Sequence, residues 1–428
     1  MRVIVLCGVM AALLLSVALA APQGDHEGHD HGPHTAEHHH HLHHGEDEPH
    51  PQHEGEHSSM LTQPNADFAF ALYKKLSALP ELQSNIFFSP LSISMALSML
   101  ALGAKGDTFS QLYQALGYAE LTPETVKKAN EHIIHMFGHE QDHVKIVANA
   151  IAVTEKAKVK DTFLEDTKHY YESETLAVDF SKSDVAVQEI NKYIAQHTNN
   201  TITDMVKDVD PDTFMMLINC LYFRGEWERP FDDDIPMKYD FHVDKNTKVT
   251  VDMMQKDGYF RVYEDKQNFI TVLELPYKGR ASMIIVMPDE GKMKEVEDSI
   301  TQAHFKHWKQ SLSGSMVKVR MPKLSISGTF SLKETLKGMG MASAFSNTAD
   351  FSGMTDLKVT LSEVEHKAIL NIHEKGTEAA AVTVPMLRYM SYLHAPFIII
   401  NRPFLVFIAE STTDSILFMG KISDPTSK

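Results

Sequence analysis

The order of the predicted elements favours an α+β domain, with helices in the first half and antiparallel strands in the second. Apolar residues recur at helical spacing up to about Gly138, and again over Asp161–Tyr171 and Ser183–His197. From Met205 onward they alternate or form short continuous runs, which indicates strands. The chain has 428 residues and can therefore bury a large core.

Each expected element follows from a local pattern. Asn65 is of a type that caps helices, and Phe68 and Leu72 follow at an interval of four residues, so a helix is expected to begin at Asn65. Helical spacing also covers Thr122–Phe137, and Gly138 is expected to end that helix. The expected strands are short apolar runs, namely Phe214–Phe223, Asn268–Leu275, Ser282–Met287, Val317–Pro322, Phe397–Phe404 and Ile416–Ile422.

Two N-terminal segments are not expected to belong to the folded domain. Residues 1–20 hold one Arg and an apolar run ending in Ala18-Leu19-Ala20, which is typical of a secretory signal peptide cleaved after Ala20. Residues 21–59 contain thirteen of the 25 histidines and too few apolar residues to fold, so a disordered His-rich tail is expected. We therefore expect a secreted, extracellular protein whose domain spans residues 60–428.

Histidines raise the question of metal binding at two places. The tail could bind Zn²⁺, Cu²⁺ or Ni²⁺ weakly, or could be a soluble spacer, and both interpretations stay open. His139-Glu140-Gln141-Asp142-His143 matches the zinc-protease pattern, which works only on a helix. Because the expected helix ends at Gly138 and strand-like sequence follows, we expect a coincidental turn here, with no metal or cofactor in the domain.

Charge and cysteine content exclude several classes of protein. The formal net charge of −17 argues against a nucleic acid partner and against a polyanion site. No second long apolar run follows the signal, so no membrane-spanning helix is expected. Cys7 leaves with the signal, and Cys220 lies in an apolar strand, where it is expected to be a buried small residue and not a reactive thiol.

The segment Glu374–Ser391 (EKGTEAAAVTVPMLRYMS) has an unusual run of small residues. Thr377, Ala379 and Ala381 occupy every second position, so in a strand they would share one face. Gly376 supplies a backbone swivel ahead of the run. Such a run fits either an exposed loop or a strand that inserts beneath a neighbouring layer.

Six motifs in order along the chain decide between these readings. They are NIFFSPLSISMALSMLALGAKGDT (85–108), MLINCLYFRGEWERPF (216–231), LPYKGRASMIIVMPDEG (275–291), MPKLSISGTFSL (321–332), SEVEHKAILNIHEKGTEAAA (362–381) and NRPFLVFIAESTTDSILFMGKISDP (401–425). Together they resemble the serpin family over roughly residues 61–428. The resemblance implies the serpin fold, with three β-sheets, about nine helices and an exposed reactive-centre loop.

The resemblance implies an inhibitor of serine proteases that acts as a suicide substrate. The protease would form an acyl-enzyme with the loop, and the cut loop would insert as an extra strand. The partner would be an extracellular serine protease in a covalent complex with a monomeric inhibitor. The chain itself would not be an enzyme, and Ser391 lacks the G-x-S-x-G surroundings of many nucleophiles.

Site residues follow from the same resemblance. The hinge would comprise Glu374, Gly376, Thr377, Glu378, Ala379, Ala380 and Ala381. In the family the bait residue lies sixteen positions after the hinge Glu, which places the reactive bond between Met390 and Ser391. Met suits elastase-like or chymotrypsin-like pockets, and Arg388 is the alternative bait for trypsin-like enzymes.

Two buried groups are also implied. Ser89, Ser92, Asn219 and His366 would form the shutter, a polar network beneath the opening sheet. Trp227, Lys323 and Glu374 match the breach, where the loop first inserts, with Lys323 and Glu374 paired. Separately, Asn199-Asn200-Thr201 is the only N-glycosylation sequon, so Asn199 is a candidate glycan site.

Two features depart from the family pattern. Pro385 lies in the stretch that must insert, and proline cannot donate a hydrogen bond in a central strand. The segment from Ser391 to Asn401 is longer than in the family member that the chain most resembles. The alternative function is a non-inhibitory serpin that carries a small hydrophobic hormone, but the small, uncharged side chains at Thr377, Ala379 and Ala381 favour the inhibitor.

Overall fold

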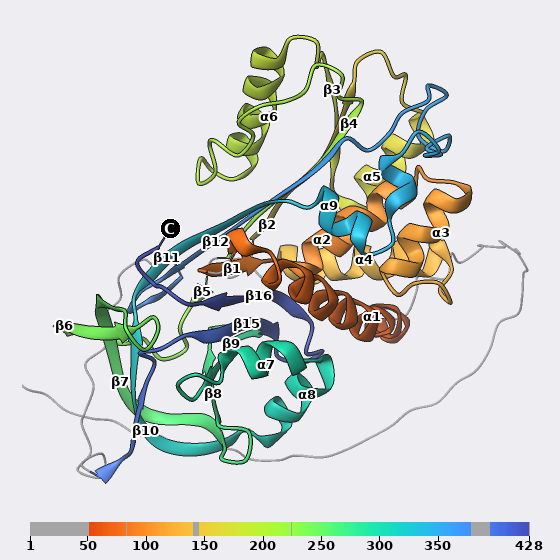
Figure 1. The fold of residues 1–428 in the computed structure, drawn as a ribbon. Coiled ribbons are helices and arrows are strands. Elements are labelled where there is room, and N and C mark those ends of the chain that lie inside the picture. Colours follow the sequence, from red (N-terminus) through yellow and green to blue (C-terminus); the bar gives the residue numbers. More distant parts are fainter. Residues whose placement is uncertain (1–50, 83, 140–144, 224, 378–393, 428) are drawn as a thin grey trace, which may run out of the picture. The chain divides into compact units, whose positions relative to one another are not determined.

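The computed structural model describes residues 51–82, 84–139, 145–223, 225–377 and 394–427. In these residues the predicted α+β class is confirmed, since most helices precede most strands along the chain (Figure 1). The described α-helices number nine: α1 Pro51–Ser77, α2 Pro90–Ala101, α3 Gly106–Ala115, α4 Pro123–His139, α5 Asp161–Tyr171, α6 Ser183–His197, α7 Met293–Ser299, α8 Gln302–Ser311 and α9 Lys333–Gly338.

Three sheets are present in the described part of the chain. The largest has nine strands in the order β1 (Asn85–Phe88), β16 (Ile416–Ile422), β15 (Phe404–Glu410), β9 (Ala281–Pro288), β8 (Ile270–Pro276), β7 (Lys248–Asp265), β10 (Ser313–Pro322) and β14 (Phe397–Ile399), with β6 (Asp232–His242) paired to β7. The five-stranded sheet has the order β11 (Leu324–Ser331), β12 (Glu363–Ile372), β4 (Met215–Tyr222), β2 (Lys145–Thr154) and β3 (Glu174–Val178). The smallest pairs β13 (Gly376–Thr377) with β5 (Gly225–Glu226).

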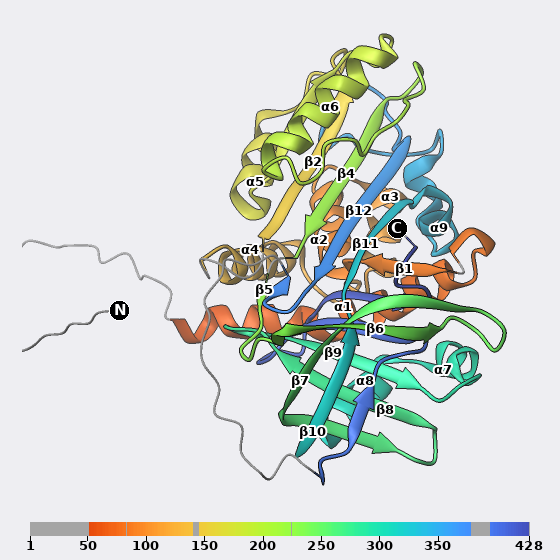
Figure 2. The same ribbon diagram turned by 90° about the vertical axis from the view of Figure 1, so that its left-hand side faces the viewer.

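The five-stranded sheet lies between two apolar cores. All eight residues of β4 are buried, because Met215 and Leu217 join the main core on one face while Met216 and Ile218 join a smaller core on the other. The smaller core is completed by α6, which lies over β2 and β4 (Figure 2). The centre of the sheet is therefore covered on both sides.

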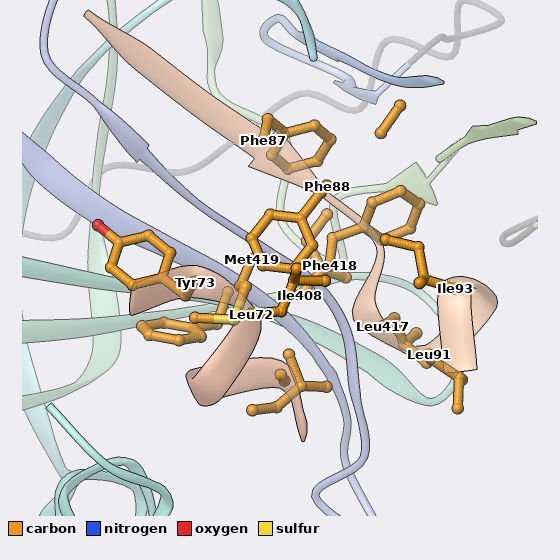
Figure 3. Packing of buried hydrophobic residues seen from close by; sticks show 14 of the residues in the cluster. Leu72, Tyr73, Phe87, Phe88, Leu91, Ile93, Ile408, Leu417, Phe418 and Met419 are labelled. Atoms are coloured by element: carbon orange, nitrogen blue, oxygen red, sulfur yellow. The ribbon is translucent and has the colours of Figure 1, made fainter. Parts of the chain in front are cut away.

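The main core joins helices to the C-terminal strands of the nine-stranded sheet. Figure 3 shows Leu72 of α1, Phe87 of β1 and Leu91 of α2 converging on β16. The rings of Phe87 and Phe418 are stacked, with centroids 5.3 Å apart and planes 7° from parallel. Full burial of such side chains is the largest favourable contribution to folding.

A buried ion pair links three elements in this region. The Lys421 ammonium on β16 lies 2.9 Å from Oε1 of Glu297 on α7, and the Tyr73 hydroxyl on α1 donates to the same oxygen at 2.6 Å. All three side chains are more than nine-tenths buried. Burial, with the adjacent Glu297 carboxylate, holds the pKa of Tyr73 well above its usual range.

Most predicted elements are confirmed, and the helices Asp161–Tyr171 and Ser183–His197 have the predicted bounds. Three expectations were wrong. The first helix begins at Pro51, inside the predicted tail, and Asn65 is not its cap but an interior residue whose Oδ1 accepts from the Tyr118 hydroxyl. Gly138 does not end α4, which continues to His139.

The third error concerns Phe397–Phe404, which is two elements and not one strand. β14 ends at Ile399, and β15 begins at Phe404 beside different neighbours in the sheet. Pro403, which lacks an N–H, lies in the break. No helix among the described residues is long and apolar enough to cross a membrane.

Candidate functional site

The structure describes only part of the predicted site. The shutter residues, the breach residues, Gly376 and Thr377 are described. The calls on Glu378, Ala379, Ala380, Ala381, Pro385, Arg388, Met390 and Ser391 lie outside the described residues, as do Glu140–His143 of the zinc-protease match. In the described ranges, no group of three or more His, Cys, Asp or Glu side chains is placed to hold a metal ion.

The two central strands of the five-stranded sheet run parallel to each other. β12 and β4 pair in parallel, with Glu363 opposite Met216 and Ile369 opposite Tyr222. On its other side β12 pairs antiparallel with β11, and β4 pairs antiparallel with β2. At the edge of the sheet, β2 and β3 pair in parallel. A strand that followed β12 by a tight turn would run antiparallel to both β12 and β4.

Such a turn has already formed at the end of β12. His373 and Gly376 exchange backbone hydrogen bonds, His373 N to Gly376 O at 2.9 Å and the reverse at 3.1 Å. Gly376 has φ +142°, and a Cβ there would overlap the backbone of Gly225 on β5, so glycine is required. The backbone of Thr377 pairs with Gly225 in the same short sheet.

The four predicted shutter residues lie together, Asn219 on β4, His366 on β12, and Ser89 and Ser92 at the start of α2. His366 is opposite Asn219 in the strand register, and its Nδ1 lies 2.5 Å from Asn219 Oδ1. The Ser92 hydroxyl donates to the same oxygen at 2.8 Å, and the Ser89 hydroxyl donates to Leu417 O at 2.6 Å. The network therefore ties both strands to the start of α2, where Ser89 is the N-cap.

The hydrogen bonds of His366 define its protonation. Its Nε2 accepts from the Ser89 backbone N–H at 3.2 Å, so the proton is on Nδ1, which donates to Asn219. Complete burial lowers the pKa of His366 to about 3. The shutter is therefore electrically neutral at physiological pH.

Sequence reasoning missed one member of this network. Asn149 on β2 is buried, and its Oδ1 accepts from Nδ2 of Asn219. The register between β2 and β4 is irregular between Ile146 and Asn149, which brings Asn149 opposite Asn219. A polar residue inside an apolar strand was the only sequence signal for it.

The breach residues also lie together, next to the turn that follows β12. Glu374 and Lys323 form an ion pair, as predicted. The Trp227 indole N–H donates to His373 O at 3.0 Å, and its ring stacks on Tyr277 with centroids 4.3 Å apart. The indole thus fixes the point where the chain leaves β12.

The two remaining predicted residues, Asn199 and Cys220, belong to neither the shutter nor the breach. Asn199 follows α6, is exposed and has φ +48°, a conformation that asparagine tolerates. Cys220 is buried in β4 with its sulfur 3.0 Å from that of Met205, and burial raises the pKa of its thiol to about 12. Both observations agree with a surface asparagine and an unreactive thiol.

Comparison with known proteins places this geometry in a family. The serpin (serine protease inhibitor) pattern matches residues 63–425. An alpha-1-antitrypsin homolog of Cyprinus carpio is 47% identical over 370 residues, covering 86% of this chain and 98% of the relative. Alpha-1-antiproteinase 2 of Equus caballus is 40% identical over 387 residues, covering 89% and 90%.

Solved structures agree. Human thyroxine-binding globulin, in a complex with its hormone, has a TM-score of 0.82 and 36% identity, with 87% of this chain and 100% of that chain covered. Human kallistatin has a TM-score of 0.78 and 34% identity, with 87% and 100% covered. The chain therefore belongs to the serpin family and has the fold of that family, and its likeness to alpha-1-antitrypsin homologs supports an inhibitor of proteases and not an enzyme.

Proposed function

We propose that this chain is a secreted inhibitor of elastase-like or chymotrypsin-like serine proteases that acts by loop insertion. The observation that carries the proposal is the preformed turn at His373–Gly376 beside the parallel pair β4 and β12. A strand that continued from this turn and lay between β12 and β4 would be antiparallel to both neighbours.

The turn also defines a register for the inserted strand. If the pairing of His373 with Gly376 continues, each residue forward in the loop lies opposite one residue back along β12. Thr377 then lies opposite Ile372, and Thr383 lies opposite His366 of the shutter. In that register the side chains at Thr377, Ala379, Ala381 and Thr383 would all lie on the buried face of β12, where small side chains would fit.

In the same register, Pro385 would remove only one hydrogen bond from the inserted strand. Gly376 donates to β12, so in alternation the even-numbered loop residues would donate to β12 and the odd-numbered ones to β4. Pro385 would then lie opposite Val364 and lose one hydrogen bond to β4, about 1 kcal/mol. Pairing with β12 would be intact.

In the chemical step the protease supplies all the catalytic groups, and this chain supplies the peptide bond that is cut. The catalytic serine oxygen attacks the carbonyl carbon of Met390, the amide bond to Ser391 breaks, and the proton passes to the nitrogen of Ser391 as a new amino terminus. Met390 stays joined to the protease as an ester. Insertion from Thr377 to Met390 would carry the enzyme roughly 45 Å at about 3.3 Å a residue.

The carrier alternative has less support in the described residues. A cavity of about 580 Å³ lies between β7, β8 and the end of α8. Three acids and three cations line it, among them the ion pairs Arg261–Glu274 and Lys309–Asp414. Small-molecule sites have few polar groups, whereas six of the twelve residues that line this cavity are charged, so the cavity does not favour a carrier of a hydrophobic hormone.

Covalent adducts on denaturing gels test the mechanism. The wild type should form an adduct with elastase or chymotrypsin. Thr377→Arg should reduce the amount of adduct by at least 90%, because insertion would bury an unpaired cation next to Ile372. Glu378→Arg is the matched control, since its side chain would lie on the half-exposed face opposite Asn371. Undiminished adduct with Thr377→Arg would contradict the proposal.

A second test concerns the bait residue. Elastase pockets accept an apolar thioether, whereas the trypsin pocket has a buried carboxylate that requires Arg or Lys. Met390→Arg should therefore lower the rate of elastase inhibition by 100-fold or more and create trypsin inhibition. Sequencing the released fragment locates the bond: an N-terminus at Ser391 supports Met390, and one at Tyr389 would make Arg388 the bait.

A further inference from the structure

Glu365 is an acidic side chain at the boundary between β12 and β4, the two strands that the proposed mechanism separates (Figure 2). It is half-buried and lies opposite Ile218 of β4 in the strand register, on the same face of the sheet. Ile218 belongs to the smaller core, whose buried residues all lie between Ala150 and Cys220, and β12 adds only the partly buried Ile369. Separation of the two strands would therefore move most of this apolar cover away from Glu365.

The Glu365 carboxylate has no counter-ion among the residues that the structure describes, and it forms no hydrogen bond with them. A second acid, Glu363, lies two residues earlier on the same face. Glu363 pairs with the nearby cation Lys333 at 3.3 Å and accepts from the Ser331 hydroxyl of β11 at 3.1 Å. Further charged or titratable side chains near this face are Cys220 of β4, Lys367 of β12, and Asp204 after α6, whose pKa is lowered by Lys207 and then by Lys367.

These surroundings disfavour the charged form of Glu365 while β4 and β12 are paired. Burial, and then the charge of Glu363, raise the pKa of Glu365 from 4.5 to about 7. Separation would let water reach the carboxylate and return its pKa toward the ordinary value. Between pH 4.5 and 7 the paired strands therefore bind more protons than the separated strands, so their pairing weakens as the pH rises. On the other face of β12, His366 has the opposite effect, because burial lowers its pKa.

We propose that Glu365 is a pH-sensitive latch between β4 and β12: the protonated carboxyl keeps the two strands paired, and the ionised carboxylate favours their separation. The role of this latch in loop insertion rests on the proposed function, whereas the latch itself does not. If insertion requires β4 and β12 to separate, a weakly alkaline solution favours it through Glu365 and a mildly acidic one retards it. The inhibitor would then respond to pH through a residue outside the bait bond.

Hydrogen exchange of backbone amides tests the latch in the intact protein, without a protease. The quantity measured is the exchange rate of wild type divided by that of Glu365→Gln, at the amides of β4 and β12. Effects of His366 and of other groups cancel in this ratio. Because glutamine has no charge, the ratio should rise about 10-fold from pH 5.5 to 7.5. Glu334→Gln is the matched control, since Glu334 is exposed and paired with Lys337 at 3.0 Å, and its ratio should stay within twofold.

The outcomes separate the latch from the inhibitory mechanism. Weaker protection of β4 and β12 than of β15 in the wild type, with the expected rise in the ratio, supports the latch. A ratio that does not change with pH would overturn it, as would an equal rise for the control. Equal protection of β4, β12 and β15 would also overturn it, because the two strands would then separate only when the whole molecule unfolds. If active proteases form no adduct with the wild type, the inhibitory mechanism is wrong, and hydrogen exchange still decides whether Glu365 controls the separation.

Discussion

The shutter and the buried ion pair are both polar groups in an apolar interior, but they differ in charge. The shutter joins β4, β12 and α2 through neutral groups, with His366 uncharged and bonded at both ring nitrogens. The ion pair joins β16 and α7 through Lys421 and Glu297, and Tyr73 of α1 donates to the same carboxylate. The shutter lies where the proposed mechanism requires β4 and β12 to separate. The ion pair lies between β16 and α7, which the mechanism does not require to separate.

The difference in charge fits this difference in role. Neutral hydrogen bonds contribute about 0.5–1.5 kcal/mol net each, so they can be exchanged for others when strands separate. A buried charge that loses its partner costs about 3–5 kcal/mol, so the elements that share one are held together. On the proposed mechanism, the neutral network therefore lies where two strands must separate, and the charged group lies outside that region.

The largest expected effect comes from breaking the ion pair. Lys421→Met would leave the Glu297 carboxylate buried without its cation, and should lower the free energy of unfolding by about 3–5 kcal/mol, measured by urea titration. Lys294→Met is the control, because its pair with Asp298 is exposed and should be worth less than 1 kcal/mol. Similar losses in both variants would remove the distinction drawn above.

A smaller loss is expected in the shutter. Asn219→Ala would leave the Nδ1–H of His366 and the Ser92 hydroxyl without their acceptor, and should cost about 2–3 kcal/mol. Asn371→Ala, also in the five-stranded sheet, removes only the acceptor of the exposed Ser325 hydroxyl and should cost less than 0.5 kcal/mol. If Asn219→Ala destabilised the protein more than Lys421→Met, the neutral network would be the stronger of the two.

Sequence reasoning predicted the fold class and the grouping of Ser89, Ser92, Asn219 and His366, but for different reasons. The α5 and α6 helices follow from apolar periodicity, a local signal that tertiary contacts reinforce. The meeting of Asn219 with His366, far apart in the chain, came only from the family resemblance. Asn149 was missed because nothing local distinguishes an asparagine that completes a network from one that ends a strand.

The same limit explains the errors in element bounds. An asparagine just before an apolar pattern of helical spacing is typical of a helix start, yet Asn65 lies inside α1, where its side chain accepts a hydrogen bond from Tyr118. The long strand β7 was not predicted because charged and apolar residues are mixed along it, and its neighbours β6, β8 and β10 supply the pairing that sequence patterns do not reveal.

The smallest expected effect is on the pH dependence of the free energy of unfolding, to which His366 and Glu365, neighbours on β12, contribute with opposite signs. Burial lowers the pKa of His366 to about 3, below the ordinary 6.5, so between these values the unfolded chain binds more protons and stability falls as pH falls. Burial, and then the charge of Glu363, raise the pKa of Glu365 from 4.5 to about 7, so there the folded chain binds more protons and stability falls as pH rises.

Between pH 4.5 and 6.5 the two contributions have opposite signs and should largely cancel, each being at most about 1.4 kcal/mol per pH unit. Glu365→Gln should therefore give a free energy of unfolding that rises with pH relative to wild type, and His366→Gln one that falls. Urea titrations of the three proteins at pH 4.5, 5.5 and 6.5 measure these slopes, and effects of all other groups cancel in the differences. Parallel profiles for all three proteins would mean that neither residue changes its protonation on folding, and that the neutrality of the shutter does not depend on the burial of His366.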